Sequence, residues 1–321
     1  MKKSNQLTLA TRPFAKENRK KSWIVTISTL TLLIVGVIST YLIPYYSIKI
    51  ITSILTGLLM VRFFVISHDY MHNAILAKSS IANAIFTVFG LFILVPKSVW
   101  KSSHDFHHRN NSKLYTTHIG SYPVISKQKF DSSSEKIKRK YLYSRNSFTI
   151  LFGYYSLFLI GMCLRPFLNN FKTHFDSFLA FIFHISLLVL VSIFLNFYMA
   201  ILLIIIPLFI TGSLGSYLFY VQHNFPDVKL KCKDDWTYEG AALESSSFLK
   251  LSPIMNWFTA NIGYHHIHHL NARIPFYRLP EVMNHFEELQ KPKTSSLKIK
   301  EIRECLKLKV WDEKLNKMIP V

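Results

Sequence analysis

Four long apolar runs alternate with polar stretches along the chain. They cover residues 23–44, 48–66, 177–197 and 199–220. Each has about the 20 residues that an α-helix needs to cross the hydrocarbon core of a bilayer. Short links join the first run to the second and the third run to the fourth, so the pattern predicts two helical hairpins in a membrane.

Two shorter apolar runs, residues 82–96 and 148–164, fall between these hairpins. Both are marginal for a full crossing, and we expect them to be interfacial or re-entrant. The polar stretches 97–145 and 221–321 then form a cap outside the bilayer. No internal repeat or Gly/Ser linker divides the chain, which predicts a single all-α integral membrane domain over residues 1–321.

Composition supports this interpretation. Half of the residues are hydrophobic and only 17% are charged, against roughly 25% charged residues in a typical soluble domain. The net charge of +20 matches the excess of Lys and Arg in cytoplasmic loops of membrane proteins. A nucleic-acid partner is disfavoured because no basic stripe interleaved with aromatic residues occurs outside the apolar runs. The basic residues before Trp23 place both termini and the cap in the cytoplasm.

Nine of the fourteen histidines fall into four groups. The groups have the sequences "HDYMH", "HDFHH", "QHNF" and "HHIHH" and contain His68, His72, His104, His107, His108, His223, His265, His268 and His269. In the predicted topology all four groups lie on the cytoplasmic side. On a helix, residues three and four apart share a face, so each HxxHH group presents its imidazoles along one stripe. His266 points elsewhere.

The other five histidines are expected to be ordinary solvated or hydrogen-bonded side chains. They are His118, His174, His184, His266 and His285. His184 lies in an apolar run, and we expect it to bond to a neighbouring helix. The cysteines Cys163, Cys232 and Cys305 lie far apart, which indicates neither a disulfide framework nor a metal knuckle.

Clustered imidazoles at this spacing indicate metal binding. Ligand type alone leaves zinc, copper, iron and nickel open. A single zinc takes four protein ligands, or three and a water, so nine histidines exceed what one ion uses. The groups therefore predict an all-histidine site for two metals at the membrane surface. Asp69 and Asp105 each follow the leading histidine of a group, where a carboxylate can accept the free ring N–H of a ligand.

The ordered series HDxxH, HDxHH, QHNF and HxxHHLxxRIPxYxL resembles the membrane fatty-acid desaturases, and most closely the acyl-lipid enzymes of the omega-6 and delta-12 type and their bacterial relatives. The resemblance runs from about His68 to Leu279, with "VQHNFP" and "NWFTANIGYHHIHHLNARIP" as its most specific parts. It implies a non-haem di-iron centre that uses O2 to place a cis double bond in the acyl chain of a membrane lipid. All nine grouped histidines are the implied iron ligands.

The resemblance also implies an electron donor and a location. The donor is a ferredoxin, a flavodoxin or a b-type cytochrome, as a separate protein, because the chain has no His-Pro-Gly-Gly haem signature and too few cysteines for an iron–sulfur cluster. The location is a bacterial inner membrane. Trp257 and Phe258 are candidates for lining an acyl channel or for anchoring at the interface. Asn224 either supports the neighbouring ligand His223 or caps a helix.

Two alternatives remain beside the desaturase. A fatty-acid hydroxylase or a carotenoid ketolase uses similar histidine groups and differs in its product. A metal transporter or sensor requires ionisable groups within the membrane spans. Apart from Arg62 and His184 the predicted spans are nearly bare of them, which disfavours this second alternative.

Overall fold

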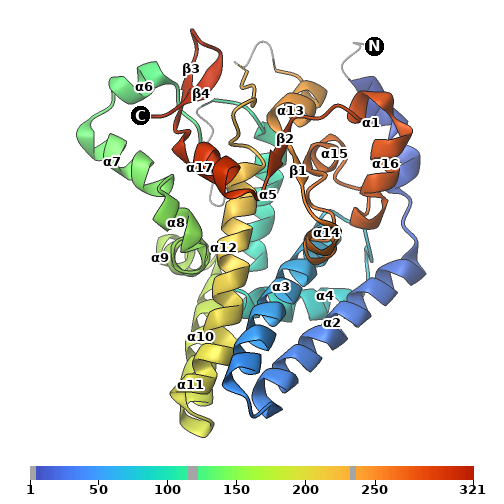
Figure 1. Cartoon of the computed structure of the whole chain (residues 1–321), viewed down its shortest axis with the longest axis vertical. Helices are drawn as coiled ribbons and strands as arrows, with labels where there is room; N and C mark the ends of the chain where they lie inside the picture. Colours follow the sequence, from blue (N-terminus) through green and yellow to red (C-terminus); the bar gives the residue numbers. More distant parts are fainter. Residues whose placement is uncertain (1–4, 115–121, 232–235) are drawn as a thin grey trace. The chain divides into compact units, whose positions relative to one another are not determined.

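The computed structural model describes residues 5–114, 122–231 and 236–321 and is mostly helical (Figure 1). The chain divides into two compact units. The apolar unit comprises Asn18–Ser102 and Leu151–Ser216, and the histidine-rich unit comprises Met1–Glu17, Ser103–Ile150 and Tyr217–Val321. The prediction of one domain over the whole chain stays a prediction.

Four helical segments of the described chain are long and apolar enough to cross a membrane. They are α2 (Arg19–Leu42), α3 (Tyr46–Met71), α10 (Phe175–Phe194) and the segment Phe197–Val221, which combines α11 (Phe197–Ala200), the π-helical η4 (Ile201–Ile205) and α12 (Ile206–Val221). The protein is therefore an integral membrane protein, and the predicted all-α class is confirmed. Helix α3 continues to Met71 instead of ending at Ile66, so His68 lies on the helix and not after it.

Small residues let α2 and α3 pack closely. The buried positions of α2 include Ser22, Thr26 and Thr29, and a Cβ at Gly36 would meet the Thr56 hydroxyl of α3 at 2.5 Å. Close approach of backbones through small side chains is the usual way in which helices associate in lipid. The Arg62 guanidinium on α3 donates from Nε to the Thr29 hydroxyl at 3.2 Å, which gives this buried charge a polar neighbour on α2.

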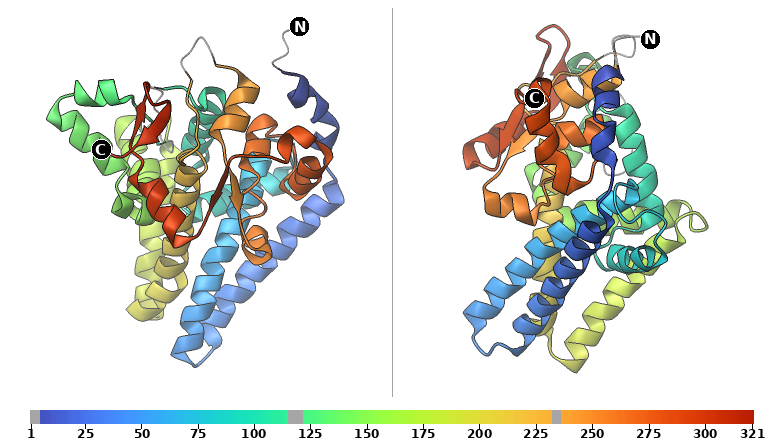
Figure 2. Two further views of the ribbon diagram at one scale, coloured as in Figure 1. Left: turned by 45° about the horizontal axis from the view of Figure 1, so that its top comes forward. Right: turned by 90° about the vertical axis from the view of Figure 1, so that its right-hand side faces the viewer.

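The second hairpin packs on the π-helix η3 (Tyr154–Leu164). Gly212 allows this contact, because a Cβ there would lie 2.6 Å from the Tyr154 backbone nitrogen. The expected bond of His184 to a neighbouring helix is confirmed: its Nε2 lies 2.7 Å from the Tyr154 hydroxyl. Figures 1 and 2 show the turns of both hairpins at the same end of the apolar unit, where the rings of Tyr46 and Tyr198 are 5.3 Å apart.

The remaining helices of the apolar unit are short. Helix α4 (Ser80–Phe92) covers most of the first marginal run and has 13 residues. The second marginal run forms η3, preceded by α8 (Ser147–Leu151) and followed by α9 (Arg165–Asn169). Three of the four unit boundaries fall inside α8, α12 and α5 (Lys97–Asn110), and the fourth lies just before α2.

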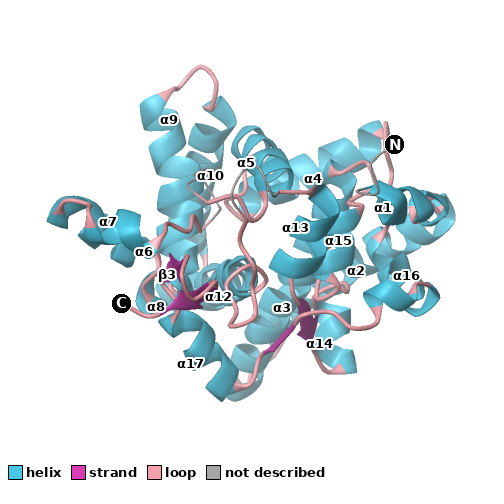
Figure 3. Ribbon diagram, turned by 90° about the horizontal axis from the view of Figure 1, so that it is seen from above, coloured by secondary structure: helices cyan, strands magenta, loops and turns pink. Residues whose placement is uncertain are grey.

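The histidine-rich unit is built from short helices and two small sheets (Figure 3). Its further helices are α1 (Gln6–Ala10), η2 (Arg12–Ala15), α6 (Lys127–Asp131), α7 (Glu135–Ser144), α13 (Tyr238–Ser245), α14 (Pro253–Phe258), α15 (His265–Leu270), η6 (Phe276–Arg278), α16 (Leu279–His285), η7 (Glu287–Leu289) and α17 (Ile299–Lys307). Strand β1 (Phe248–Lys250) pairs in parallel with β2 (Thr294–Ser296), and β3 (Val310–Asp312) pairs antiparallel with β4 (Lys317–Ile319).

The N-terminal segment, residues 6–17, is tied to parts of this unit that are distant in sequence. The Asn271 amide donates to the Thr11 hydroxyl at 3.1 Å. The Arg278 guanidinium donates to the carbonyl oxygens of Pro13 and Phe14 at 3.3 and 3.2 Å, and it also pairs with Glu281 at 2.9 Å. These contacts fasten the segment to the chain that follows α15.

Candidate metal centre

Helices α5 and α15 carry six of the grouped histidines, and each helix contributes to two clusters. The first histidine group consists of His104, His108 and His268, and the second histidine group consists of His107, His223, His265 and His269. Helix α5 gives an i, i+4 pair to the first group and His107 to the second, whereas α15 gives an i, i+4 pair to the second group and His268 to the first. The three imidazoles of an HxxHH sequence thus do not serve one site together, as a single stripe would suggest.

The second histidine group forms a closed ring of Nε2 atoms. The Nε2 of His107 lies 3.0 Å from that of His223 and 3.2 Å from that of His269. The Nε2 of His265 completes the ring, 2.9 Å from His223 and 3.1 Å from His269. In a square or a tetrahedron with such edges, a central point lies about 2 Å from every corner, which is the length of a metal–imidazole bond.

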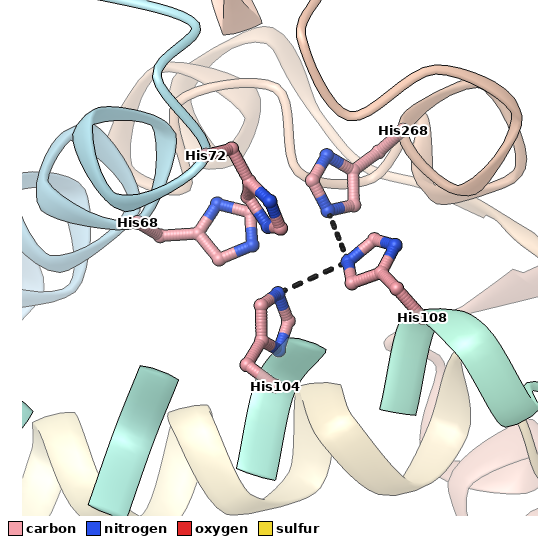
Figure 4. Close-up of side chains that lie close together, drawn as sticks. All are labelled: His68, His72, His104, His108 and His268. Carbon is pink, nitrogen blue, oxygen red and sulfur yellow. Dashed lines mark hydrogen bonds between the residues drawn. The ribbon is translucent and has the colours of Figure 1, made fainter. Parts of the chain in front are cut away.

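The first histidine group shows the same convergence (Figure 4). The Nε2 of His108 lies 3.1 Å from the Nε2 of His104 and 3.0 Å from the Nε2 of His268. Figure 4 also draws His68 and His72, which belong to the apolar unit. These two follow the i, i+4 spacing at the end of α3, and their ring centroids are 4.6 Å apart.

The protonation state of the imidazoles in the second histidine group favours metal binding. The Nδ1 of His223 lies 3.0 Å from the Ser245 carbonyl oxygen, which can only accept, so Nδ1 carries the proton and Nε2 keeps its lone pair. Burial lowers the pKa of His223 to about 4, although the bond to Ser245 opposes this shift. Burial also holds the pKa of His269 well below its usual value. His223 and His269 are therefore neutral near pH 7, as a metal requires of its imidazole ligands.

A glycine sets the position of α15. Leu249 of β1 donates its backbone N–H to the Gly263 carbonyl at 2.8 Å. A Cβ at Gly263 would lie 2.6 Å from the Leu249 carbonyl oxygen, so only glycine permits this approach. The preceding turn places Asn261 at φ 57°, a conformation that asparagine tolerates well. Gly263 lies two positions before His265, so these residues fix where the helix starts.

His223 lies in a turn after α12, and its neighbours hold that turn from both sides. The Gln222 amide donates to the Ile262 carbonyl oxygen at 2.8 Å. The Asn224 amide donates to the Cys305 carbonyl oxygen at 2.8 Å, and its side-chain oxygen accepts from Arg145. The side chain of Asn224 thus ties the turn to α17 and to Arg145.

Arg145 is a residue that the sequence did not single out. Its side chain is fully buried and donates to the carbonyl oxygens of Tyr122 and Pro123 at 3.2 and 3.0 Å. The guanidinium also lies 5.1 Å from the ring centre of Tyr220. Within the described residues no carboxylate pairs with Arg145. It ends the basic run "KIKRKYLYSR", so nothing in its local sequence distinguishes it from solvated neighbours.

The other predicted site residues lie as follows. The Asp69 carboxylate approaches the Nδ1 of His68 at 3.2 Å, as the support of a ligand requires. Asp105 is half-buried on α5. Trp257 and Phe258 end α14 with ring centroids 5.1 Å apart, and Trp257 is exposed. His266 is buried off the ligand face, 6.0 Å from the Phe248 ring. His118 and Cys232 lie outside the described residues.

Comparison with known proteins identifies the family. The model of the fatty acid desaturase family matches residues 46–296. A fatty acid desaturase of Bacillus subtilis (strain 168) is 30% identical over 320 residues, which cover 97% of this chain and 89% of the relative. The sn-1 oleoyl-lipid 12-desaturase of Synechocystis sp. is 22% identical over 280 residues, or 85% and 77% of the two chains. A chloroplastic omega-6 fatty acid desaturase of Brassica napus is 25% identical over 277 residues, or 81% and 58%.

The chain belongs to the fatty acid desaturase family. It is accordingly an oxidoreductase of the non-haem di-iron class, with histidine clusters that suit two metal ions.

Proposed function

We propose that the protein is an O2-dependent desaturase that places a cis double bond in the acyl chain of a membrane lipid. The observation that carries this proposal is the closed ring of four Nε2 atoms in the second histidine group, beside a separate first group, in a chain of the desaturase family. Two adjacent all-nitrogen sites suit two iron ions, because imidazole is a good ligand for iron.

The proposed ligand set contains nine histidines. The second histidine group supplies four ligands to one iron. The first histidine group, joined by His68 and His72, supplies five to the other. Their i, i+4 spacing and the contact of His68 with Asp69 support the assignment of this pair. When bound, the two irons would supply the oxidising power to remove hydrogen from two adjacent methylene groups with O2 and two electrons.

Neighbouring residues fix the orientation and the protonation state of the proposed ligands. Ser245 fixes the tautomer of His223, and burial keeps His223 and His269 neutral. Such fixed donors reduce the reorganisation that ligand binding and reaction require. Asp69 plays the corresponding part for His68.

The substrate and the redox partner follow from the family and the composition. The name of the Synechocystis relative, an sn-1 oleoyl-lipid 12-desaturase, supports an acyl-lipid substrate. Electrons come from a separate ferredoxin, flavodoxin or b-type cytochrome. The excess of Lys and Arg supports a cytoplasmic location of both termini and the histidines. The membrane we propose is a bacterial inner membrane.

The test is expression with a redox donor in a host that lacks desaturases, followed by gas chromatography–mass spectrometry of total fatty acids. We expect new cis alkenes from the wild type, none from His269→Ala, and full activity from His285→Ala, whose histidine is exposed and outside both groups. Hydroxy or keto products would instead identify a hydroxylase or a ketolase. Unchanged lipids from an iron-loaded enzyme with a working donor would contradict all three activities.

A further inference from the structure

A basic stripe runs along the exposed face of α7. Lys136, Arg139, Lys140 and Tyr143 follow the spacing i, i+3, i+4 and i+7, which places them on one side of the helix. All four side chains are exposed. The opposite face is anchored, because the buried Tyr141 packs with Phe130 and Val310. Figures 1 and 3 show α7 at the edge of its unit.

Among the described residues, no carboxylate neutralises the cations of the stripe. Segment 127–150 contains two carboxylates, Asp131 and Glu135. Asp131 pairs with Lys127 at 2.5 Å and Glu135 with Lys138 at 3.0 Å. Within the described residues, Lys136, Arg139 and Lys140 therefore have no acidic partner. Three adjacent exposed cations that have no acidic partner in the described part of the chain favour an anionic ligand.

Apolar side chains beside the stripe indicate what kind of anion it meets. Tyr143, at the C-terminal end of the stripe, is 66% exposed, and Phe148, in the following helix α8, is 72% exposed. From there the chain leads directly into the apolar helix η3. Tyrosine is enriched where a membrane protein crosses the headgroup level. An acidic soluble protein would leave these aromatic side chains in water. A bilayer surface offers anionic headgroups to the cations and an apolar environment to the rings.

We propose that the basic stripe binds the headgroups of anionic phospholipids at the bilayer surface. Lys and Arg contact the lipid phosphates, and Tyr143 and Phe148 enter the interface next to them. Lys and Arg close to an anionic membrane surface are attracted to it, and tyrosine is enriched at the headgroup level. The stripe is separate from both histidine groups and does not depend on the proposed reaction.

The experiment measures lipid selectivity of the full chain in vesicles of phosphatidylcholine. Electron spin resonance compares the association of spin-labelled phosphatidylglycerol with that of spin-labelled phosphatidylcholine. The test variant carries Lys136→Gln, Arg139→Gln and Lys140→Gln. The control carries Lys291→Gln, Lys293→Gln and Lys314→Gln, which remove equal charge from exposed positions elsewhere. Unfolding temperatures of both variants confirm folding, since all six side chains are exposed.

We expect the preference for phosphatidylglycerol to fall by about fivefold or more in the stripe variant, because each basic residue near an anionic surface contributes substantially. The control should keep the preference, and salt should weaken it in the wild type. An unchanged preference in the stripe variant, or an equal loss in the control, would overturn the proposal. The proposal would also be overturned if the stripe variant kept its lipid selectivity but no longer bound an acidic ferredoxin. That result would assign the surface to the redox partner.

Discussion

The histidines of α5 and α15 differ from His223 in how they are held. The former lie on helices, where backbone geometry sets their spacing, and each helix orients three imidazoles by itself. His223 lies beyond the end of α12 and depends on Gln222, Asn224 and Ser245 to hold its turn. The comparison teaches that helix-borne ligands need few supporting contacts, whereas a ligand in a turn needs several from distant parts of the chain.

The largest effects should come from removing the ligands themselves. His223→Ala and His265→Ala should each reduce activity by more than about 100-fold, beyond the effect of losing a supporting residue. Only His223→Ala should recover in added imidazole, because His223 lines a pocket with Phe106, His107 and Asn110, where a free ring can enter. Product formation with and without imidazole provides the measurement. Equal rescue of both variants by imidazole would contradict the proposed difference between the ligand in the turn and the ligand on the helix.

Removing a support of the turn should come next. Asn224→Ala loses the link to both Arg145 and the Cys305 carbonyl oxygen, and His223 should then lose its fixed position. We expect a fall in iron affinity of about 10- to 100-fold. The rate of iron removal by a chelator measures it. Asn271→Ala, which breaks the contact with Thr11 instead, serves as the control and should keep wild-type iron affinity. Equal iron loss from both variants would contradict the role of Asn224.

Arg145 should affect stability more than chemistry. Arg145→Met leaves one buried and two partly buried acceptors without this donor, and we expect a loss of about 2 kcal/mol in the free energy of unfolding. Arg145→Lys keeps the charge but cannot reach all three acceptors, and its unfolding temperature in detergent should be intermediate. If the methionine variant were as stable as the wild type, the free-energy cost of burying the Arg145 charge would equal the stabilisation from its hydrogen bonds.

The smallest effect concerns Lys309, which donates to the Arg145 and Leu306 carbonyl oxygens. Burial, and then the Arg145 charge, lower the pKa of Lys309 to about 8 from its usual 10.5. Between these values the unfolded chain binds more protons than the folded one, so this group makes stability rise as pH increases from about 8 to 10.5. The rise should be smaller in Lys309→Met, as thermal unfolding over this range would measure. An equal rise of stability with pH in the wild type and in Lys309→Met would refute this role of Lys309.

The pattern of the sequence was sufficient to predict the membrane helices and to select the set of histidines that could bind metal. Long apolar runs and i, i+3, i+4 spacing are local properties, and they predicted the four spans and the grouping of histidines along the chain. The division of each HxxHH sequence between two groups was not predictable, because it depends on how α5 and α15 face each other. Arg145 was missed for a similar reason: its partners lie 22, 23 and 79 residues away in sequence.

The attachment of the N-terminal segment has a consequence for biosynthesis. Arg278 bonds to carbonyl oxygens 262, 264 and 265 residues earlier in the chain. The ribosome therefore releases that segment long before its partners exist, and it must remain undocked while the apolar helices enter the bilayer. Docking of residues 6–17 is thus among the last steps of maturation, and protection of this segment from a protease would mark the molecules whose folding is complete.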